Sequence, residues 1–335
     1  MNAIANRLKS LIFVFFTVLL CAGCARLPEL SANPWDVISL DTESTFSDIA
    51  FTDSNADRGW LVGSNATLFA TQDGGKTWEA QALDLGEENP RFNAIDFAGD
   101  EGWIVGEPSL LLHTEDGGKS WSRIALSKKL PGNPRTIVAL GSQLAEMTTD
   151  VGAIYRTEDG GKTWKATVEE ALGAMRNITR APDGQYIAVS SLGNFYSTWE
   201  PGATAWVPHN RSNARHVQNM GFTPDGHLWM LARGGQIQFT GAEGLEDWQE
   251  PIYPEKTGGW GLLDLAYRTP DELWVVGGSG TLLCSPDGGQ TWLKDRELDN
   301  VPSNFNKVKF LSEERGFVLG QRGTLLRYRG SQQGA

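Results

Sequence analysis

The sequence predicts an all-β fold assembled from repeated sheets, because tryptophan recurs at almost constant intervals along its 335 residues. Successive marker tryptophans are 43, 43, 43, 42, 42 and 44 residues apart, and they are Trp35, Trp78, Trp121, Trp164, Trp206, Trp248 and Trp292. The chain also contains 39 Gly and 15 Pro, which supply the turns that many short strands need. A period of about 40–45 residues with four strands per unit is typical of a β-propeller.

Each repeat contains four short runs with the composition of β-strands. In the second copy these are residues 92–97, 102–106, 110–114 and 121–126, with turn-forming residues at each joint. The first run occurs seven times, beginning at Phe46, Phe92, Arg135, Met175, His216, Leu262 and Phe305. The sequence therefore predicts seven blades, each a four-stranded antiparallel sheet.

The seventh repeat lacks a closing tryptophan strand, while the strand-like run 35–40 stands alone before the first repeat. An open ring would leave unpaired sheet edges, which promote association between chains. We therefore expect the N-terminal strand to pair into the last blade and close the ring. The predicted organisation is a single propeller domain over residues 35–330, followed by a tail over 331–335.

The first 23 residues are predicted to be an export signal. Arg7 and Lys9 precede the apolar run 11–20, which is too short for a comfortable transmembrane span. The run ends in LLCAGC, which resembles the bacterial lipobox with Cys24 as the lipidated residue, although Cys21 stands where Leu is usual. Lipid chains at Cys24 would hold the protein at a membrane, with residues 24–34 as a tether. Simple cleavage without lipidation is the alternative.

Charge and residue composition exclude several classes of ligand. The net charge of −12 argues against a general binder of nucleic acids or anionic membranes. The four histidines have no metal-ligand spacing, so we expect neither a metal nor a cofactor. Cys284 lies in an apolar run and is predicted to be a small buried residue.

A heptapeptide close to Glu-Asp-Gly-Gly-Lys-Thr-Trp occurs four times between the third and fourth runs of a repeat. With the preceding residue it resembles the Asp-box of several propeller families. We expect its Asp to accept backbone N–H bonds, a Gly to adopt positive φ and the Trp to pack against the neighbouring turn; the aspartates are Asp73, Asp116, Asp159 and Asp287. A phosphate-binding loop is disfavoured because the Gly pair leads into a strand, not a helix.

Arginines are concentrated in the middle of the chain. Residues 135–233 contain seven Arg and two Lys against nine acids, so the acidic excess lies elsewhere. In a propeller, the connections between blades and the turns between second and third strands share one face, opposite the Asp-box turns. Five arginines fall at such positions, namely Arg135, Arg176, Arg211, Arg215 and Arg233, with Arg91 and Arg322 as outliers. They predict a protein-binding patch, because guanidinium groups bind carboxylates and main-chain carbonyls well. The alternative is that these arginines are ordinary residues of a solvent-exposed surface.

The export leader with Cys24, the ordered blades carrying Gly-Trp-x-Val-Gly and Asp-Gly-Gly-Lys-Thr-Trp, and the arginine-rich middle together resemble the photosystem II stability/assembly factor family of cyanobacteria and plastids. The resemblance spans residues 31–330. It implies a non-enzymatic, monomeric assembly factor, lipid-anchored on the lumenal side of the thylakoid membrane. Such a factor binds newly made reaction-centre subunits, in particular the precursor form, during biogenesis and repair. It also implies an arginine patch, which we carry over to the five positions above.

Two other functions remain open on the sequence alone. Sialidase-like glycosidases also carry Asp-boxes on propellers and use a Tyr nucleophile with a Glu partner, but their Arg-Ile-Pro motif is absent here. The tyrosines of this chain fall mostly within strand-like runs, where core packing is the simpler expectation. A generic extracytoplasmic protein-binding propeller would account for the repeats equally well.

Overall fold

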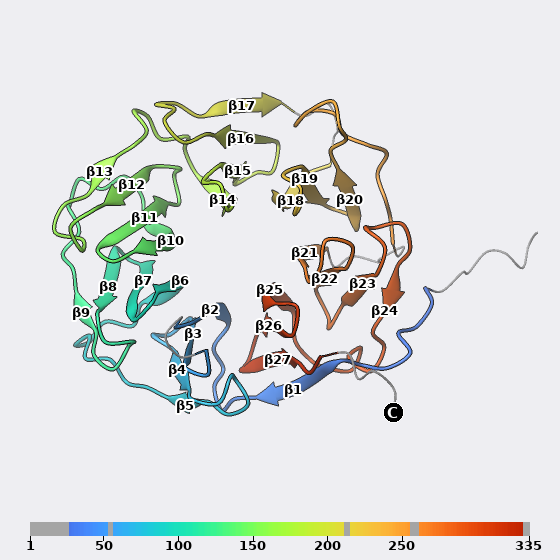
Figure 1. The fold of residues 1–335 in the computed structure, drawn as a ribbon, viewed down its shortest axis with the longest axis horizontal. Helices are drawn as coiled ribbons and strands as arrows, with labels where there is room; N and C mark the ends of the chain where they lie inside the picture. The colour runs from blue at the N-terminus through green and yellow to red at the C-terminus, as the bar shows by residue number, and fades with distance from the viewer. Residues whose placement is uncertain (1–26, 53–55, 211–214, 255–260, 331–335) are drawn as a thin grey trace, which may run out of the picture.

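The computed structural model describes residues 27–52, 56–210, 215–254 and 261–330, and its strands form seven sheets arranged as the blades of a ring (Figure 1). The predicted seven-bladed propeller is therefore confirmed. The export signal, Cys24, Arg211 and the tail lie outside the described residues.

The blades follow one another around the ring in chain order, and within each blade the strands run from the central channel outward (Figure 1). Blade 1 contains β2 (Phe46–Phe51), β3 (Gly59–Gly63), β4 (Leu68–Thr71) and β5 (Glu79–Ala80). Blade 2 contains β6 (Arg91–Ala98), β7 (Glu101–Glu107), β8 (Leu110–Thr114) and β9 (Ser122–Arg123). Blade 3 contains β10 (Pro134–Gly141), β11 (Leu144–Thr149), β12 (Ile154–Thr157) and β13 (Lys165–Ala166). Blade 4 contains β14 (Met175–Arg180), β15 (Tyr186–Ser190), β16 (Phe195–Trp199) and β17 (Val207–Asn210).

Blades 5 to 7 form the rest of the ring. Blade 5 contains β18 (Val217–Phe222), β19 (Leu228–Ala232) and β20 (Gln236–Phe239). Blade 6 contains β21 (Leu262–Tyr267), β22 (Leu273–Gly277), β23 (Leu282–Ser285) and β24 (Leu293–Lys294). Blade 7 contains β25 (Phe305–Ser312), β26 (Arg315–Gly320), β27 (Thr324–Tyr328) and, as its outermost strand, β1 (Trp35–Ser39).

Blade 5 departs from the four-stranded pattern at its outer edge. There the chain makes two isolated antiparallel bridges, Thr240 with Trp248 and Ile237 with Ile252, instead of a continuous fourth strand. Pro251 lies between them and has no N–H to donate to a ladder, which explains the interruption. The outer strands of blades 1, 2, 3 and 6 are also short, at two residues each, which limits the exposed edge available for pairing with other chains.

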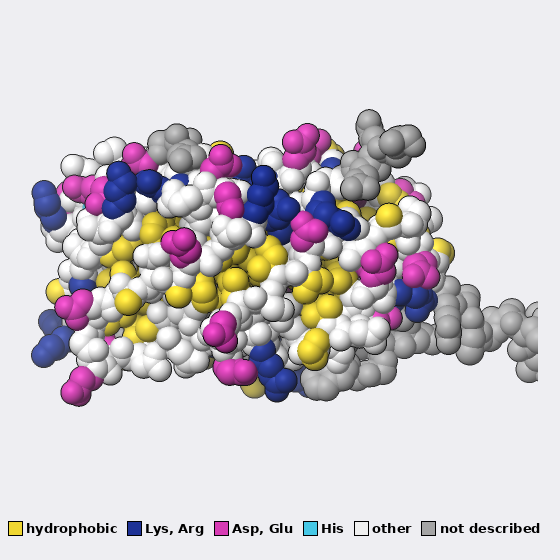
Figure 2. Space-filling view, turned by 90° about the horizontal axis from the view of Figure 1, so that it is seen from below, with side chains coloured by type: hydrophobic (Ala, Val, Ile, Leu, Met, Phe, Trp, Pro, Cys, Tyr) yellow, Lys and Arg dark blue, Asp and Glu magenta, His cyan; other side chains and the backbone are white. Residues whose placement is uncertain are grey.

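The hydrophobic core consists of seven clusters, each between two neighbouring blades. Every residue of β3, β15, β19 and β22 is buried, because blades pack against both faces of these strands. Seen from the side, hydrophobic side chains also form a band along the rim, with charged groups above and below it (Figure 2).

The ring is closed by the N-terminal strand, as predicted. Strand β1 pairs antiparallel with β27 in a register that runs from Trp35 opposite Tyr328 to Ser39 opposite Thr324. Trp35 is 2% exposed, and its ring lies 5.3 Å from that of Trp274 and 5.2 Å from that of Tyr328, centroid to centroid. The two ends of the chain thus form one blade and share one aromatic core.

The segment that precedes β1 also contacts the ring. The N–H of Lys294 donates to the carbonyl of Pro28 (3.0 Å), and the N–H of Leu30 donates to the carbonyl of Lys294 (3.1 Å). Leu27 and Leu30 pack against the cores on either side of blade 6. Residues 27–30 of the predicted tether therefore lie along β24.

The Asp-box turns share one hydrogen-bonding pattern. In blade 1, Oδ1 of Asp73 accepts bonds from the N–H groups of Lys76 (3.0 Å) and Thr77 (2.9 Å), while Oδ2 accepts the Thr77 hydroxyl (2.7 Å). Gly75 has φ of 86°, and its carbonyl accepts the indole N–H of Trp78 (3.1 Å). Equivalent bonds from the Thr or Ser four residues downstream reach Asp116, Asp159 and Asp287.

These bonds favour the ionised carboxylate. The bonds from the hydroxyl and N–H of Thr77 lower the pKa of Asp73 to about 2, and those of Thr163 do the same for Asp159. Because the folded pKa is lower than the unfolded one, the stabilisation is present above the unfolded pKa and is lost as pH falls toward about 2.

Replacement of Trp35 by Ala should lower the free energy of unfolding by about 3–5 kcal/mol, because it removes a buried aromatic from the closing strand. Urea denaturation measures this change. Val37→Ala is the matched control, since Val37 lies on the same strand but is 47% exposed, and it should cost less than about 1 kcal/mol. Equal effects of the two changes would show that the closing strand is not an integral part of the fold.

Replacement of Asp159 by Ala should lower the urea midpoint at pH 7, because three hydrogen bonds to its carboxylate are lost. The difference from the wild type should shrink as pH is lowered to about 2, where the wild-type carboxylate also becomes protonated. Glu158→Ala, at the exposed neighbouring position, should change neither quantity. A pH-independent difference would contradict the assigned role of the charge.

Candidate functional site: an arginine face

The two faces of the ring carry different turns. On one face, each Asp-box turn contacts the turn between the first and second strands of its own blade, as in the bonds from Gly74 to the Asp57 carbonyl (2.9 Å) and from Gly117 to the Asp100 carbonyl (2.8 Å). On the other face, the turn after the second strand contacts the chain that enters the first strand, as in the bond from Arg233 N–H to the His216 carbonyl (2.9 Å). We call these the Asp-box face and the arginine face.

The structure brings four of the five predicted arginines together on the arginine face. The Nη2 atom of Arg135 donates a hydrogen bond to the carbonyl of Arg176 (3.0 Å), and this bond connects blade 3 to blade 4. Two nitrogens of Arg176 donate to the carbonyl of Ser191 (3.3 and 3.1 Å), and a third donates to Gln218 of blade 5. The Nη1 atom of Arg215 donates a hydrogen bond to the carbonyl of Arg233 (3.2 Å). These bonds hold guanidinium groups in place at the entrance to the inner strands.

Like charges lie close together along this surface. Burial, and after it the charge of the nearby Arg91, lowers the pKa of Arg135. In the same way burial and the charge of Arg233 lower the pKa of Arg176. Arg91, which begins β6 in blade 2, therefore joins the set, although the sequence marked it as an outlier. The arginine strip thus consists of Arg91, Arg135, Arg176, Arg215 and Arg233.

Arg322, the second outlier, lies in the turn between β26 and β27 in blade 7, with φ of 53°. Blade 7 and blades 2–5 occupy different parts of the ring (Figure 1). The strip therefore covers blades 2 to 5 of the arginine face.

Acidic groups near Arg135 partly neutralise the charge of the strip. Glu107 and Asp150 partly offset the fall in the pKa of Arg135. Asp150 itself accepts bonds from the backbone and side chain of Asn133 (2.9 and 3.2 Å). Among the described residues, no carboxylate contributes to the lowered pKa of Arg176.

A polar cluster in the channel escaped the sequence analysis. Oδ1 of Asp48 in blade 1 lies 2.8 Å from Nζ of Lys307 and 3.4 Å from Nζ of Lys309 in blade 7. Oδ2 of the same carboxylate accepts the N–H of Ile95 in blade 2 (3.3 Å). One carboxylate thereby links three blades near the closure. The sequence signal was an Asp at the third position of the first run of repeat 1 and Lys at the third and fifth positions of the same run in repeat 7.

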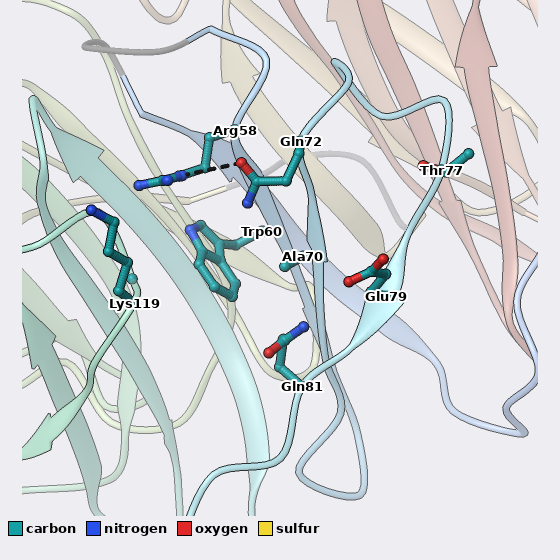
Figure 3. A pocket seen from close by; sticks show the side chains of 9 residues that line it. Arg58, Trp60, Ala70, Gln72, Thr77, Glu79, Gln81 and Lys119 are labelled. Carbon is teal, nitrogen blue, oxygen red and sulfur yellow. Dashed lines mark hydrogen bonds between the residues drawn. The ribbon is translucent and has the colours of Figure 1, made fainter.

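A groove between blades 1 and 2 is lined by groups of both charges (Figure 3). Its volume is about 340 Å³, and Trp60, which is 5% exposed, lies between Arg58 and Ala70. Arg58 Nε donates to Oε1 of Gln72 (3.4 Å), while Lys119 approaches from the next blade. Within the described ranges, no group of three His, Cys, Asp or Glu side chains could hold a metal ion.

A tyrosine–glutamate pair of the kind a sialidase-like site would require is buried. The Tyr186 hydroxyl donates to Oε1 of Glu146 (2.8 Å), and Nε of Arg180 donates to the same oxygen (2.9 Å). Tyr186 is 1% exposed and Glu146 4%, so a sugar cannot reach them. Burial and the Glu146 charge raise the pKa of Tyr186 well above its usual value, which opposes nucleophilic attack. The trio instead links blades 3 and 4.

Comparison with known proteins agrees with this architecture. A solved structure described as YCF48 bound to D1 peptide is 57% identical, has a TM-score of 0.88, and the match covers 90% of this chain and 99% of that one. YCF48 from Cyanidioschyzon merolae is 40% identical with a TM-score of 0.82, and the match covers 89% of this chain and 99% of that one.

A curated relative gives the same result over the full length. The photosystem II assembly lipoprotein Ycf48 of Synechocystis sp. is 62% identical over 328 residues, which is 98% of this chain and 96% of the relative. The family model described as photosynthesis system II assembly factor YCF48 matches residues 27–329. The chain therefore belongs to the YCF48 family of photosystem II assembly factors.

Proposed function

We propose that this protein is a non-enzymatic assembly factor of photosystem II that binds newly made reaction-centre subunits through the arginine strip. Family membership supports the assembly role, and a relative of 57% identity has been solved with a D1 peptide. The observation that carries the proposal is the row of arginines shared by blades 2 to 5 on one face of an acidic protein.

The chemistry of the strip suits a carboxylate-bearing segment. Adjacent guanidinium groups repel one another, and an anionic ligand relieves that repulsion on binding. Arginine also presents a planar fork that matches a carboxylate with two parallel bonds. Because Arg135 and Arg176 are already held by backbone carbonyls, little side-chain freedom is lost when the ligand arrives. The ligand class that fits is a peptide with a C-terminal or side-chain carboxylate.

The precursor form of the client and the lumenal location belong to the same proposal. Lipidation of Cys24 would anchor the protein to the thylakoid membrane, and the Synechocystis relative is named a lipoprotein. Cys24 precedes the docked Leu27 by three residues, a reach of at most about 10 Å. The rim of blade 6 would then lie close to the bilayer. In the part of the chain that the structure describes, no helix has the length and apolar character to span a membrane.

Charge reversal at Arg176 and Arg215 together should weaken binding of a peptide from the C-terminal segment of a precursor reaction-centre subunit by at least about tenfold, because attraction becomes repulsion. Surface plasmon resonance with the immobilised peptide measures this. The melting temperature should fall by no more than a few degrees, since Arg215 is exposed and Arg176 is only half-buried.

A matched control reverses two charges away from the strip. Lys76 and Lys119 are exposed and lie in Asp-box turns, on the opposite face of the ring. Their joint replacement by Glu changes the net charge by the same amount and should leave the affinity within about twofold if the effect is local. Wild-type affinity in the Arg176→Glu/Arg215→Glu variant would refute the strip as the binding surface.

A further inference from the structure

Two large hydrophobic side chains are exposed on the arginine face, beside the arginine strip. Leu192 lies in the turn after β15 and is 68% exposed, while Tyr253 follows the outer bridge of blade 5 and is 43% exposed. Exposed apolar side chains next to a charged surface are typical of interaction sites. The other large exposed hydrophobics among the described residues, Val37, Val207 and Leu311, belong to strands β1, β17 and β25.

Direct contacts connect both side chains to the strip. Arg176 donates to the carbonyl of Ser191, the residue before Leu192. The carbonyl of Leu192 lies 2.6 Å from Nδ1 of His216, the residue after Arg215. Leu192, His216 and Arg215 therefore lie next to one another at the boundary between blades 4 and 5.

Tyr253 lies against the next arginine. The guanidinium carbon of Arg215 is 5.1 Å from the centre of the Tyr253 ring, a cation–π contact. The Tyr253 hydroxyl donates to Oε1 of the buried Gln236 (3.4 Å), which fixes the far end of the ring. One face of the ring is occupied by Arg215, and the side chain remains 43% exposed, so apolar surface stays available next to a cation.

We propose that Leu192 and Tyr253 are the apolar part of the client-binding surface and select segments with a bulky apolar side chain next to a carboxylate. This inference rests on the proposed function, because the arginine strip supplies the attraction for the carboxylate. Arginine and aromatic side chains that share one surface form the centre of many protein interfaces. The occupant is an extended peptide segment of the client, since the acidic group and its apolar neighbour must reach adjacent sites at once.

Direct binding of synthetic peptides tests this selectivity. The probes are fluorescein-labelled hexapeptides Gly-Ser-Gly-Ser-Xaa-Ala with a free C-terminal carboxylate, in which Xaa is Leu, Phe or Ser, and the same peptides ending in an amide. Fluorescence anisotropy on the mature chain gives each Kd. We expect the Leu and Phe peptides to bind about five- to tenfold more tightly than the Ser peptide, from the apolar area that their side chains bury.

Variants separate the apolar contribution from the electrostatic one. Leu192→Ser/Tyr253→Ser should reduce the preference for Leu and Phe to less than about twofold while the Kd of the Ser peptide stays unchanged. Val37→Ser/Val207→Ser removes comparable exposed apolar area elsewhere and should keep the preference. Arg176→Glu/Arg215→Glu should weaken all carboxylate peptides alike.

The outcomes distinguish the two proposals. A preference that persists in the Leu192→Ser/Tyr253→Ser variant, or is absent from the wild type, overturns the apolar assignment and leaves the arginine strip intact. Amide peptides that bind as tightly as carboxylate peptides overturn the proposed recognition of a carboxylate. Failure of every peptide to bind the wild type counts against both.

Discussion

The pairing of β1 with β27 is the constraint on which the rest of the molecule depends. It joins the two ends of the chain into one blade, so every blade has a neighbour on both sides and no core face is left open. The closure is supported from within by Trp35 and from the channel by Asp48, which holds two lysines of blade 7. Because the ring is closed, the entrances of all its inner strands lie around a single opening.

That convergence explains how residues far apart in sequence become one surface. Arg135 and Arg176 are separated by 41 residues, nearly one repeat, and so occupy similar places in neighbouring blades. Burial, and after it the like charge of a neighbouring arginine, lowers the pKa of Arg135 and Arg176, so placing these arginines together costs electrostatic free energy. Bonds to backbone carbonyls offset part of that cost. The remaining repulsion is available to favour an anionic partner.

The sequence predicted those features of the fold that recur with the period of the marker tryptophans. The blade number, the closing strand and the turn that carries each Asp-box follow from marker residues and local turn chemistry. Contacts between repeats were not predictable in the same way. Lys307 and Asp48 are 259 residues apart, and the position of Arg91 beside Arg135 depends on side-chain conformations. The interruption at Pro251 in the outer edge of blade 5 does not follow the repeat pattern, and neither does the docking of residues 27–30 on blade 6. The repeat pattern therefore could not predict them.

The blade shared by both termini has a consequence for the order in which the protein matures. Asp36 and Arg327, which are bonded across that blade, are separated by 291 residues. Synthesis of the chain begins at its N-terminal end, so β1 waits without its partner until almost the whole polypeptide has been made. Long-range pairing of this kind is slow to form. Completion of the circle therefore requires that synthesis has finished, and a prematurely terminated chain retains an unpaired edge that can pair with other chains.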